Sequence, residues 1–146
     1  MTLRVMHVAE VALRVIDLPR ALSFYQEVLG LEIVRAYPTM VFLKAGELAS
    51  PLGRGGHPQL LVLFDRKVPL DIALTTLDHI AFEISLEHYP VERERLQRFG
   101  LEVTERIWRG EYAWLQARSL FFDDPDGNTI EFIAHDPNAA NTAPSG

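Results

Sequence analysis

The sequence of 146 residues contains no cysteine, very few lysines and no long hydrophobic run. The absence of cysteine excludes disulfides, thiolate metal sites and cysteine nucleophiles. No stretch reaches the roughly 20 apolar residues that a membrane helix needs, so no membrane partner is expected. The first residues, Met1-Thr2-Leu3-Arg4, lack the charged and then apolar pattern of a signal peptide, which predicts a cytoplasmic protein.

Positive charge is also in deficit. The chain has 14 Lys and Arg residues against 20 Asp and Glu residues, which gives a formal net charge of −6. Proteins that bind nucleic acid usually carry a basic excess, so no nucleic-acid partner is expected. Arginine far outnumbers lysine, and its planar guanidinium suits the capture of carboxylates. Some arginines are therefore candidates for binding a small acidic ligand.

The chain does contain an internal repeat. Segment 10–15 (EVALRV) returns 69 residues later as segment 79–84 (HIAFEI), and segment 30–33 (GLEI) returns 70 residues later as 100–103 (GLEV). Each half therefore follows the same order of strand, helix, glycine and strand. The repeat gives Glu10 and His79 equivalent positions, and a duplicated fold can bring two such positions to one cavity.

Hydrophobic periodicity and turn residues predict the elements of each half. In the first half Asp17 can cap a helix that Gly30 ends, and a loop is expected at 46–58. The strands of this half are expected at 5–16, 31–37, 39–45 and 59–64. In the second half a helix is expected at 89–99, and a tight turn at 124–127 precedes the last strand. The strands of this half are expected at 77–84, 101–107, 112–117, 119–122 and 129–134.

These elements predict an α+β fold with two tandem βαβββ modules that form a curved mixed sheet around one cavity. Residues 1–136 are expected to form a single domain, with module one at 5–65, a linker at 66–76 and module two at 77–135. The tail 137–146 is rich in Asn, Ala, Pro and Ser and is expected to be disordered.

Four polar residues fall in matching regions of the predicted inner strands: Glu10, Gln59, His79 and Glu131. Imidazole, carboxylate and amide ligands without thiolate suit a divalent ion such as Zn, Ni, Mn, Fe or Co. With open positions left, such an ion can polarise a carbonyl or bind two neighbouring oxygens of a substrate. The alternative for each residue is a solvated side chain on the wet face of a strand. The pattern alone leaves both interpretations open, a metal site and solvated side chains, and it does not name a metal.

Three longer motifs carry a resemblance to a known family. They are the run 13–31 (LRVIDLPRALSFYQEVLGL), segment 78–82 (DHIAF) and segment 124–132 (DPDGNTIEF). These motifs resemble the vicinal-oxygen-chelate superfamily, which includes glyoxalase I, extradiol dioxygenases, methylmalonyl-CoA epimerase, fosfomycin-modifying enzymes and bleomycin-binding proteins. The resemblance covers nearly the whole chain except the tail. It implies a glyoxalase-like fold, but it separates the reactions poorly because function depends on the site.

The resemblance implies metal ligands at Glu10, His79 and Glu131, with a fourth ligand position near Gln59. Many members carry histidine where this chain has Glu10, so the set of two histidines and one glutamate that binds iron in ring-cleaving dioxygenases is incomplete. Many glyoxalase and epimerase members use the fourth position as well. The metal remains open among the same five divalent ions.

Two further positions differ from the ring-cleaving dioxygenases. Phe121 stands where those enzymes often have tyrosine, and Trp114 stands where they have histidine. Phenylalanine cannot donate a hydrogen bond to a substrate oxygen, and tryptophan cannot act as a base. These differences count against iron-dependent ring cleavage.

The resemblance also implies roles in substrate binding. Arg14 matches an arginine with which glyoxalase I members grip a substrate carboxylate, although a surface ion pair with Glu83 is an equal alternative. Trp114, Phe121 and Arg118 are further candidates for contact with a small-molecule substrate.

The chemistry implied by the resemblance is that of an isomerase or lyase acting on a small oxygenated substrate. In this mechanism the metal holds an enediolate while Glu131 or Glu10 moves a proton between adjacent carbons. Two other functions remain open: an extradiol ring-cleavage dioxygenase, and a non-catalytic protein that sequesters a drug-like ligand as bleomycin-resistance proteins do. The resemblance further implies a homodimer.

Overall fold

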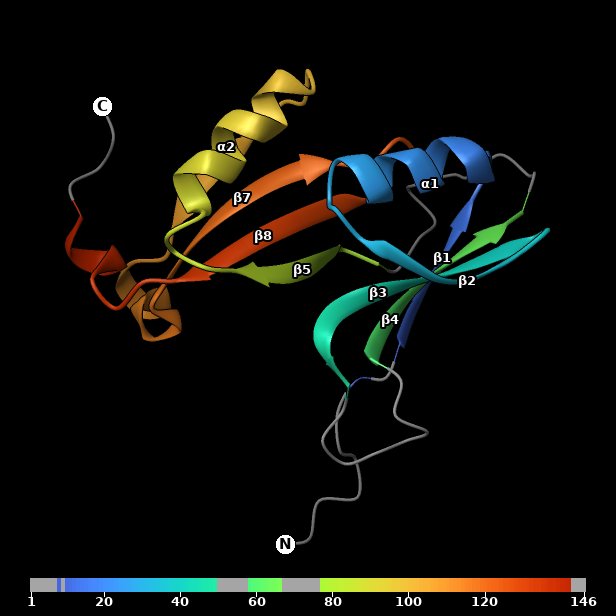
Figure 1. Cartoon of the computed structure of the whole chain (residues 1–146). Coiled ribbons are helices and arrows are strands. Elements are labelled where there is room, and N and C mark those ends of the chain that lie inside the picture. The colour runs from blue at the N-terminus through green and yellow to red at the C-terminus, as the bar shows by residue number, and fades with distance from the viewer. Residues whose placement is uncertain (1–7, 9, 50–57, 67–76, 143–146) are drawn as a thin grey trace, which may run out of the picture. The chain divides into compact units, whose positions relative to one another are not determined.

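The computed structural model describes residues 8, 10–49, 58–66 and 77–142. Two compact units make up the chain, residues 1–71 and 72–146, and each unit has its own four-stranded sheet (Figure 1). Most of the predicted linker, most of the predicted first loop and the start of the first predicted strand lie outside the described residues.

The first unit is built around a sheet with the strand order β1-β4-β3-β2. Strand β1 runs parallel to β4, and the other neighbours are antiparallel. The helix begins where the Asp17 carboxylate accepts a hydrogen bond from the backbone N–H of Arg20 at 3.0 Å, and Gly30 follows it with a left-handed φ of 71°. The elements are β1 Glu10–Val15, α1 Leu18–Glu27, β2 Glu32–Tyr37, β3 Met40–Ala49 and β4 Pro58–Asp65.

The second unit repeats this order with the sheet β5-β8-β7-β6, in which β5 runs parallel to β8. Gly100 follows its helix with a φ of 80°, as Gly30 does in the first unit. In Figure 1 helix α2 (yellow) lies above this sheet. The elements are β5 His79–Ile84, α2 Tyr89–Arg98, β6 Thr104–Ile107, η2 Gly110–Leu115, β7 Ala117–Asp123, β8 Thr129–His135 and η3 Ala139–Asn141.

Each unit buries the face of its sheet that its own helix covers. Because side chains alternate along a strand, every second residue of each inner strand contributes to this core. In the first unit the buried side chains are Leu13, Val15, Leu18, Tyr25, Val41, Leu43, Leu61 and Leu63. In the second unit they are Tyr89, Leu96, Leu120, Phe122, Ile130 and Phe132. The side chains that alternate with these core residues lie on the opposite face of each sheet.

The predicted α+β class and the two tandem βαβββ modules are confirmed. The turn before β8 forms as expected, because the Asp124 carboxylate accepts hydrogen bonds from the backbone N–H groups of Asp126 and Asn128 at 2.9 and 2.8 Å. Gly127 takes the left-handed conformation of this turn, with a φ of 83°. Among the described residues, no helix is both long and apolar enough to cross a membrane.

Two segments differ from the prediction. The strand expected at 112–117 is the 3₁₀ helix η2, which starts at Gly110 with a φ of 60° and ends before Gln116, also left-handed with a φ of 47°. These two left-handed residues turn the chain sharply at both ends of the segment.

The described part of the expected tail is also ordered. Asp136 is buried, and its carboxylate accepts hydrogen bonds from Asn138 N at 3.0 Å and from Arg118 Nε at 3.1 Å. Ala139 is fully buried at the start of η3. The side chain of Asp136 thus fixes the chain after β8.

Candidate functional site

Helix α2 covers one face of the second sheet. The candidate site lies on the opposite face. Strand register pairs Glu131 with Ala81 on one side and with Phe121 on the other. Since paired residues of neighbouring strands point to the same side, Glu131 shares its face with Phe121 and, by alternation, with His79 and Ser119. The neighbouring residues Arg118 and Leu120 point to the α2 face instead.

His79 and Glu131 are in direct contact. The Nε2 atom of His79 lies 3.0 Å from Oε2 of Glu131, and its Nδ1 atom lies 2.7 Å from Oδ2 of Asp78. A ring that donates its Nδ1–H to Asp78 turns a lone pair on Nε2 toward the Glu131 carboxylate. Two acceptors at this distance require a proton or a metal cation between them. Histidines that bind metals commonly have a carboxylate on their outer nitrogen, as His79 has Asp78.

Glu131 is held from its other side by a chain of hydrogen bonds. Its side chain is 5% exposed, and its Oε1 atom accepts a hydrogen bond from the Ser119 hydroxyl at 2.6 Å. The Ser119 oxygen in turn accepts one from the Trp108 indole N–H at 2.9 Å. Phe121 meets the His79 ring edge to face with centroids 6.1 Å apart. Both side chains of the pair are therefore fixed by their neighbours.

In the first unit Glu10 has the position that the repeat predicts. It is the first residue of β1, as His79 is the first residue of β5, and both strands run parallel to the last strand of their module. The side chain of Glu10 lies outside the described part of the chain.

The register of the first sheet does not support Gln59 as a ligand beside Glu10. The residue paired with Glu10 is Leu60, so Gln59 points to the opposite face, that of Leu61. The amide of Gln59 donates a hydrogen bond to the Val8 carbonyl at 3.2 Å. The residue of β4 that corresponds to Glu131 is Val62, which pairs with Ala12 as Glu131 pairs with Ala81. The prediction of Gln59 as a metal ligand rested on the chemistry of its side chain. The strand register excludes Gln59 from the face of Glu10.

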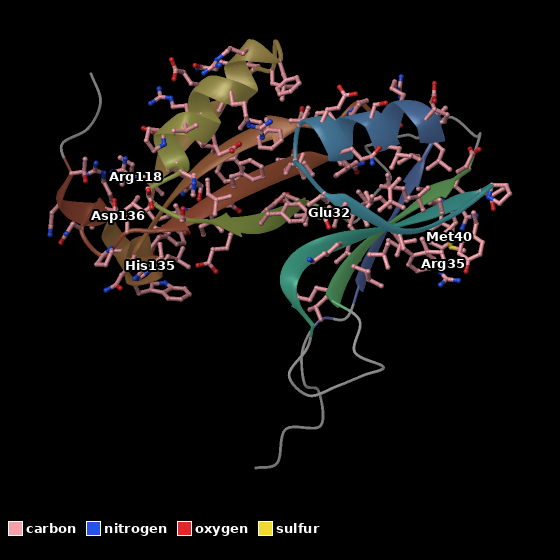
Figure 2. The ribbon with its side chains drawn as sticks, viewed as in Figure 1. Glu32, Arg35, Met40, Arg118, His135 and Asp136 are labelled. Atoms are coloured by element: carbon pink, nitrogen blue, oxygen red, sulfur yellow. The ribbon has the colours of Figure 1, made fainter. Side chains whose placement is uncertain are left out.

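The candidates for substrate contact are distributed differently from the prediction. Arg14 is exposed on β1, Trp114 is 76% exposed on η2, and Phe121 lies beside His79. Arg118 is on the α2 face, where its guanidinium lies 5.4 Å from the ring centroid of Tyr89 and its Nε lies 3.1 Å from Asp136 Oδ2. Figure 2 shows Arg118 and Asp136 next to each other, and Arg118 therefore does not share the face of Glu131.

The arginine that does share the Glu131 face is Arg106. Register pairs it with Ser119, and its guanidinium lies 4.0 Å from the centroid of the Trp108 ring. Sequence reasoning also missed Asp78, Ser119 and Trp108, which orient His79 and Glu131. Two of these had a signal in the sequence: Asp78 directly precedes His79, and Ser119 lies two residues before Phe121 on one strand face. Trp108 had none, because its contact with Ser119 links two strands.

The described residues contain no cluster of three His, Cys, Asp or Glu side chains that could bind a metal. The pair of His79 and Glu131 supplies two ligands, one nitrogen and one oxygen. Their 3.0 Å separation equals that of two neighbouring ligands at right angles around an ion with bonds of about 2.1 Å. The pair therefore fits a divalent ion without rearrangement.

A sequence model of the Glyoxalase/Bleomycin resistance protein/Dioxygenase superfamily matches residues 5–132 of this chain. An integron cassette protein from the mobile metagenome of the Halifax Harbour sewage outfall is a solved structure similar to it. That protein is 26% identical, with a TM-score of 0.67, and the match covers 89% of this chain and 99% of that one.

Two further solved structures show the shared fold. Lactoylglutathione lyase from Agrobacterium tumefaciens is 24% identical, with a TM-score of 0.63 and coverage of 90% of this chain and 95% of that one. The fosfomycin resistance protein FosX from Listeria monocytogenes is 21% identical, with a TM-score of 0.64 and coverage of 92% and 98%. A point variant of FosX has been crystallised with Mn(II) and 1S,2S-dihydroxypropylphosphonic acid.

Proposed function

Because this chain belongs to the glyoxalase/bleomycin resistance protein/dioxygenase superfamily, we propose that it is a metal-dependent enzyme with isomerase or lyase chemistry on a small oxygenated substrate. The observation that carries the proposal is the contact between His79 and Glu131 on the face of the second sheet opposite α2. Both side chains are preoriented by a second set of residues, as is usual for metal ligands.

The proposed ligands are His79, Glu131 and Glu10. The first two are supported by their 3.0 Å contact and the third by its strand position, which is equivalent to that of His79. The candidate ions are Zn, Ni, Mn, Fe and Co, because a site with one imidazole and two carboxylates suits borderline and hard cations. An ion bound there would act as a Lewis acid toward two neighbouring oxygens of the substrate.

The proton transfer falls to the glutamates. Both oxygens of Glu131 are engaged, one by Ser119 and the other by His79, which favours Glu10 as the residue that moves the proton between adjacent carbons. Arg14 lies on the same strand as Glu10 and shares its alternation, so it is the candidate for gripping a substrate carboxylate. Phe121 packs edge to face against the ring of His79.

The solved relatives support this class of chemistry. One is named a lactoylglutathione lyase, and another was crystallised with Mn(II) and a dihydroxylated phosphonic acid, a substance with two neighbouring hydroxyl groups. At this low identity they support a reaction type and leave the substrate open. The homodimer and the cytoplasmic location expected from the sequence stay predictions, and light scattering of the purified protein tests the first.

The test begins with the full chain purified without added metal, followed by metal analysis and thermal unfolding with each of the five ions. A real ligand raises the unfolding temperature of the protein that binds it. The wild type is expected to gain stability from at least one ion, while Glu131→Gln, which keeps the size of the side chain, gains none. Proton transfer is then followed in heavy water as deuterium uptake next to the carbonyl of small α-hydroxy carbonyl compounds.

The two other functions are outcomes of the same experiment. Oxygen consumption with catechols by the Fe(II)-loaded protein would establish the dioxygenase, although Phe121 offers no hydroxyl beside His79. A wild type that binds none of the five ions contradicts the proposal. The protein would then be a binding protein of the sequestering type.

A further inference from the structure

We propose that Trp108 and Ser119 act as positioning residues that make Glu131 a ligand through one oxygen only. This inference rests on the proposed function, because it concerns how the proposed metal site is set. The three residues form a chain of hydrogen bonds from Trp108 Nε1 to Ser119 Oγ at 2.9 Å and from Ser119 Oγ to Glu131 Oε1 at 2.6 Å. We call this set the indole–hydroxyl–carboxylate chain.

The direction of these hydrogen bonds is fixed by their chemistry. An indole N–H can only donate, so the Ser119 oxygen must accept from Trp108. The single hydrogen of the Ser119 hydroxyl then points to Oε1 of Glu131. This hydrogen bond fixes the orientation of the carboxylate with Oε1 toward Ser119 and uses one of the two lone pairs of that oxygen, so the other oxygen, Oε2, is the one that faces His79. The indole–hydroxyl–carboxylate chain thereby selects which oxygen of Glu131 meets the cation.

Ser119 cannot easily turn away from this position. Its side chain is fully buried, and its backbone carbonyl accepts a hydrogen bond from the Tyr89 hydroxyl at 3.1 Å on the other side of the strand. The single hydrogen of the Tyr89 hydroxyl is shared between the Ser119 carbonyl and Glu105 Oε2, which lies 2.9 Å from the hydroxyl oxygen. The serine is therefore held through both its backbone and its side chain.

The indole at the start of the chain is held as firmly. The Arg106 guanidinium lies 4.0 Å from the centroid of the Trp108 ring, and the Tyr112 ring meets that ring at an angle of 67° with centroids 5.8 Å apart. Cation–π and edge-to-face contacts of this kind fix the plane of an aromatic ring. These contacts already fix the Trp108 side chain with its N–H pointing at Ser119, so the hydrogen bond costs little additional conformational entropy.

The test measures Mn(II) affinity of the full chain and, in the same samples, the indole N–H resonances of a ¹⁵N-labelled protein. The chain has two tryptophans, so two signals are expected, and Trp114→Phe assigns them. Ser119→Ala should lower Mn(II) affinity by about 10- to 100-fold, the usual cost of losing an outer partner of a ligand. Trp108→Phe should lower it by a smaller factor, and Trp114→Phe is the matched control that leaves affinity unchanged.

Three readouts separate positioning from a merely structural role. Ser119→Ala should shift the Trp108 resonance and speed its exchange with solvent, while the Trp114 resonance stays in place. Ser119→Thr keeps the hydroxyl and should restore much of the affinity. In the Co(II)-loaded protein, Ser119→Ala should change the visible spectrum, because the freed Oε1 can now also reach the ion.

Each contrary result has one meaning. Absence of metal binding by the wild type contradicts the proposed function. A wild type that binds Mn(II), with a Ser119→Ala variant that binds equally well, overturns only the positioning role. An unmoved Trp108 resonance in Ser119→Ala shows that the indole–hydroxyl–carboxylate chain does not exist. If Ser119→Ala does not fold, equal affinity of Trp108→Phe and Trp114→Phe overturns the inference.

Discussion

The two modules have the same strand order, yet the corresponding faces of their sheets differ in character. Where the second sheet has Glu131, the first has the buried Val62, and both pair with an alanine of the parallel strand. Ser119 has its counterpart in Met40, because Ser119 pairs with Ile133 as Met40 pairs with Phe64. The duplicated scaffold is therefore shared, whereas the buried carboxylate and its hydroxyl partner occur in one copy only.

This difference limits what each module can contribute to the proposed metal site. Parallel pairing of the first and last strands gives each module the same two neighbouring positions on the sheet face opposite its helix. In the second module these positions hold His79 and Glu131, and in the first they hold Glu10 and Val62. The first module can thus supply at most one ligand from these two positions. Substitutions in each module test whether the second module supplies two metal ligands and the first supplies one.

The largest effect is expected from exchanging the carboxylate of the second module. Glu131→Gln keeps the size and the acceptor for Ser119 but removes the charge, so metal affinity should fall at least about 100-fold. The matched change in the first module, Val62→Ala, should leave metal affinity within about threefold and cost about 2 kcal/mol of stability through a cavity. Calorimetric metal titration and urea unfolding measure the two quantities. If both variants lose metal affinity equally, the two matching positions do not differ in their contribution to metal binding.

The next effect tests the contribution of the first module. Glu10→Ala should lower metal affinity by about 10- to 100-fold, because it removes a charged ligand. Gln59→Ala is the control and should change affinity less than twofold, since the register turns Gln59 to the other face. The same metal titration applies. If Gln59→Ala weakens binding as much as Glu10→Ala, the strand register does not decide the ligand set.

A smaller effect is expected at Asp78, which holds the ring of His79. Asp78→Asn replaces an acceptor that lies 2.7 Å from Nδ1 with an amide that can present either oxygen or nitrogen. The carboxylate is 95% exposed, so we expect a loss of metal affinity of about tenfold, the lower end for such partners. An affinity equal to that of the wild type would show that Asp78 does not orient His79.

The smallest effect concerns stability at high pH. Burial and the hydrogen bond to Glu105 raise the pKa of Tyr89 above its ordinary value of 10.0. Below pH 10 both the folded and unfolded tyrosine keep their proton, so the stabilisation is fully present. Above it the unfolded tyrosine ionises first, and the free energy of unfolding should fall by at most about 1.4 kcal/mol per pH unit.

Tyr89→Phe provides the comparison for this pH effect. The variant should be less stable at neutral pH by about 1 kcal/mol, because Glu105 and the Ser119 carbonyl lose a donor. Urea unfolding at about pH 9 and about pH 11 should show a shallower alkaline loss than in the wild type. The same slope in both proteins would contradict the assignment of this proton to Tyr89.

The fold could be predicted from the sequence because its signals are local and occur twice. Strand alternation, the Asp17 cap and the two glycines after the helices each determine a short segment, and the repeat supports the first strand and the glycine of each half a second time. The prediction was wrong for 112–117, where alternating aromatic residues favoured a strand. There two left-handed residues, Gly110 and Gln116, set the conformation instead.

The site could be predicted only in part, for a physical reason. Alternation correctly put His79 and Glu131 on one face, because both belong to neighbouring parallel strands. The repeat offset of 69 residues leads from Glu131 back to Val62, so the error at Gln59 was already visible in the sequence. Trp108 could not be placed, because its hydrogen bond to Ser119 depends on how β6 and β7 align in space.

The most direct test of the central claim is a crystal structure of the wild-type protein grown with Mn(II), using anomalous scattering to locate the ion. We predict an anomalous peak within bonding distance of both His79 Nε2 and Glu131 Oε2, with Glu131 Oε1 still bonded to Ser119. An ion bound elsewhere, or no ion at this pair at saturating Mn(II), would contradict the proposed site.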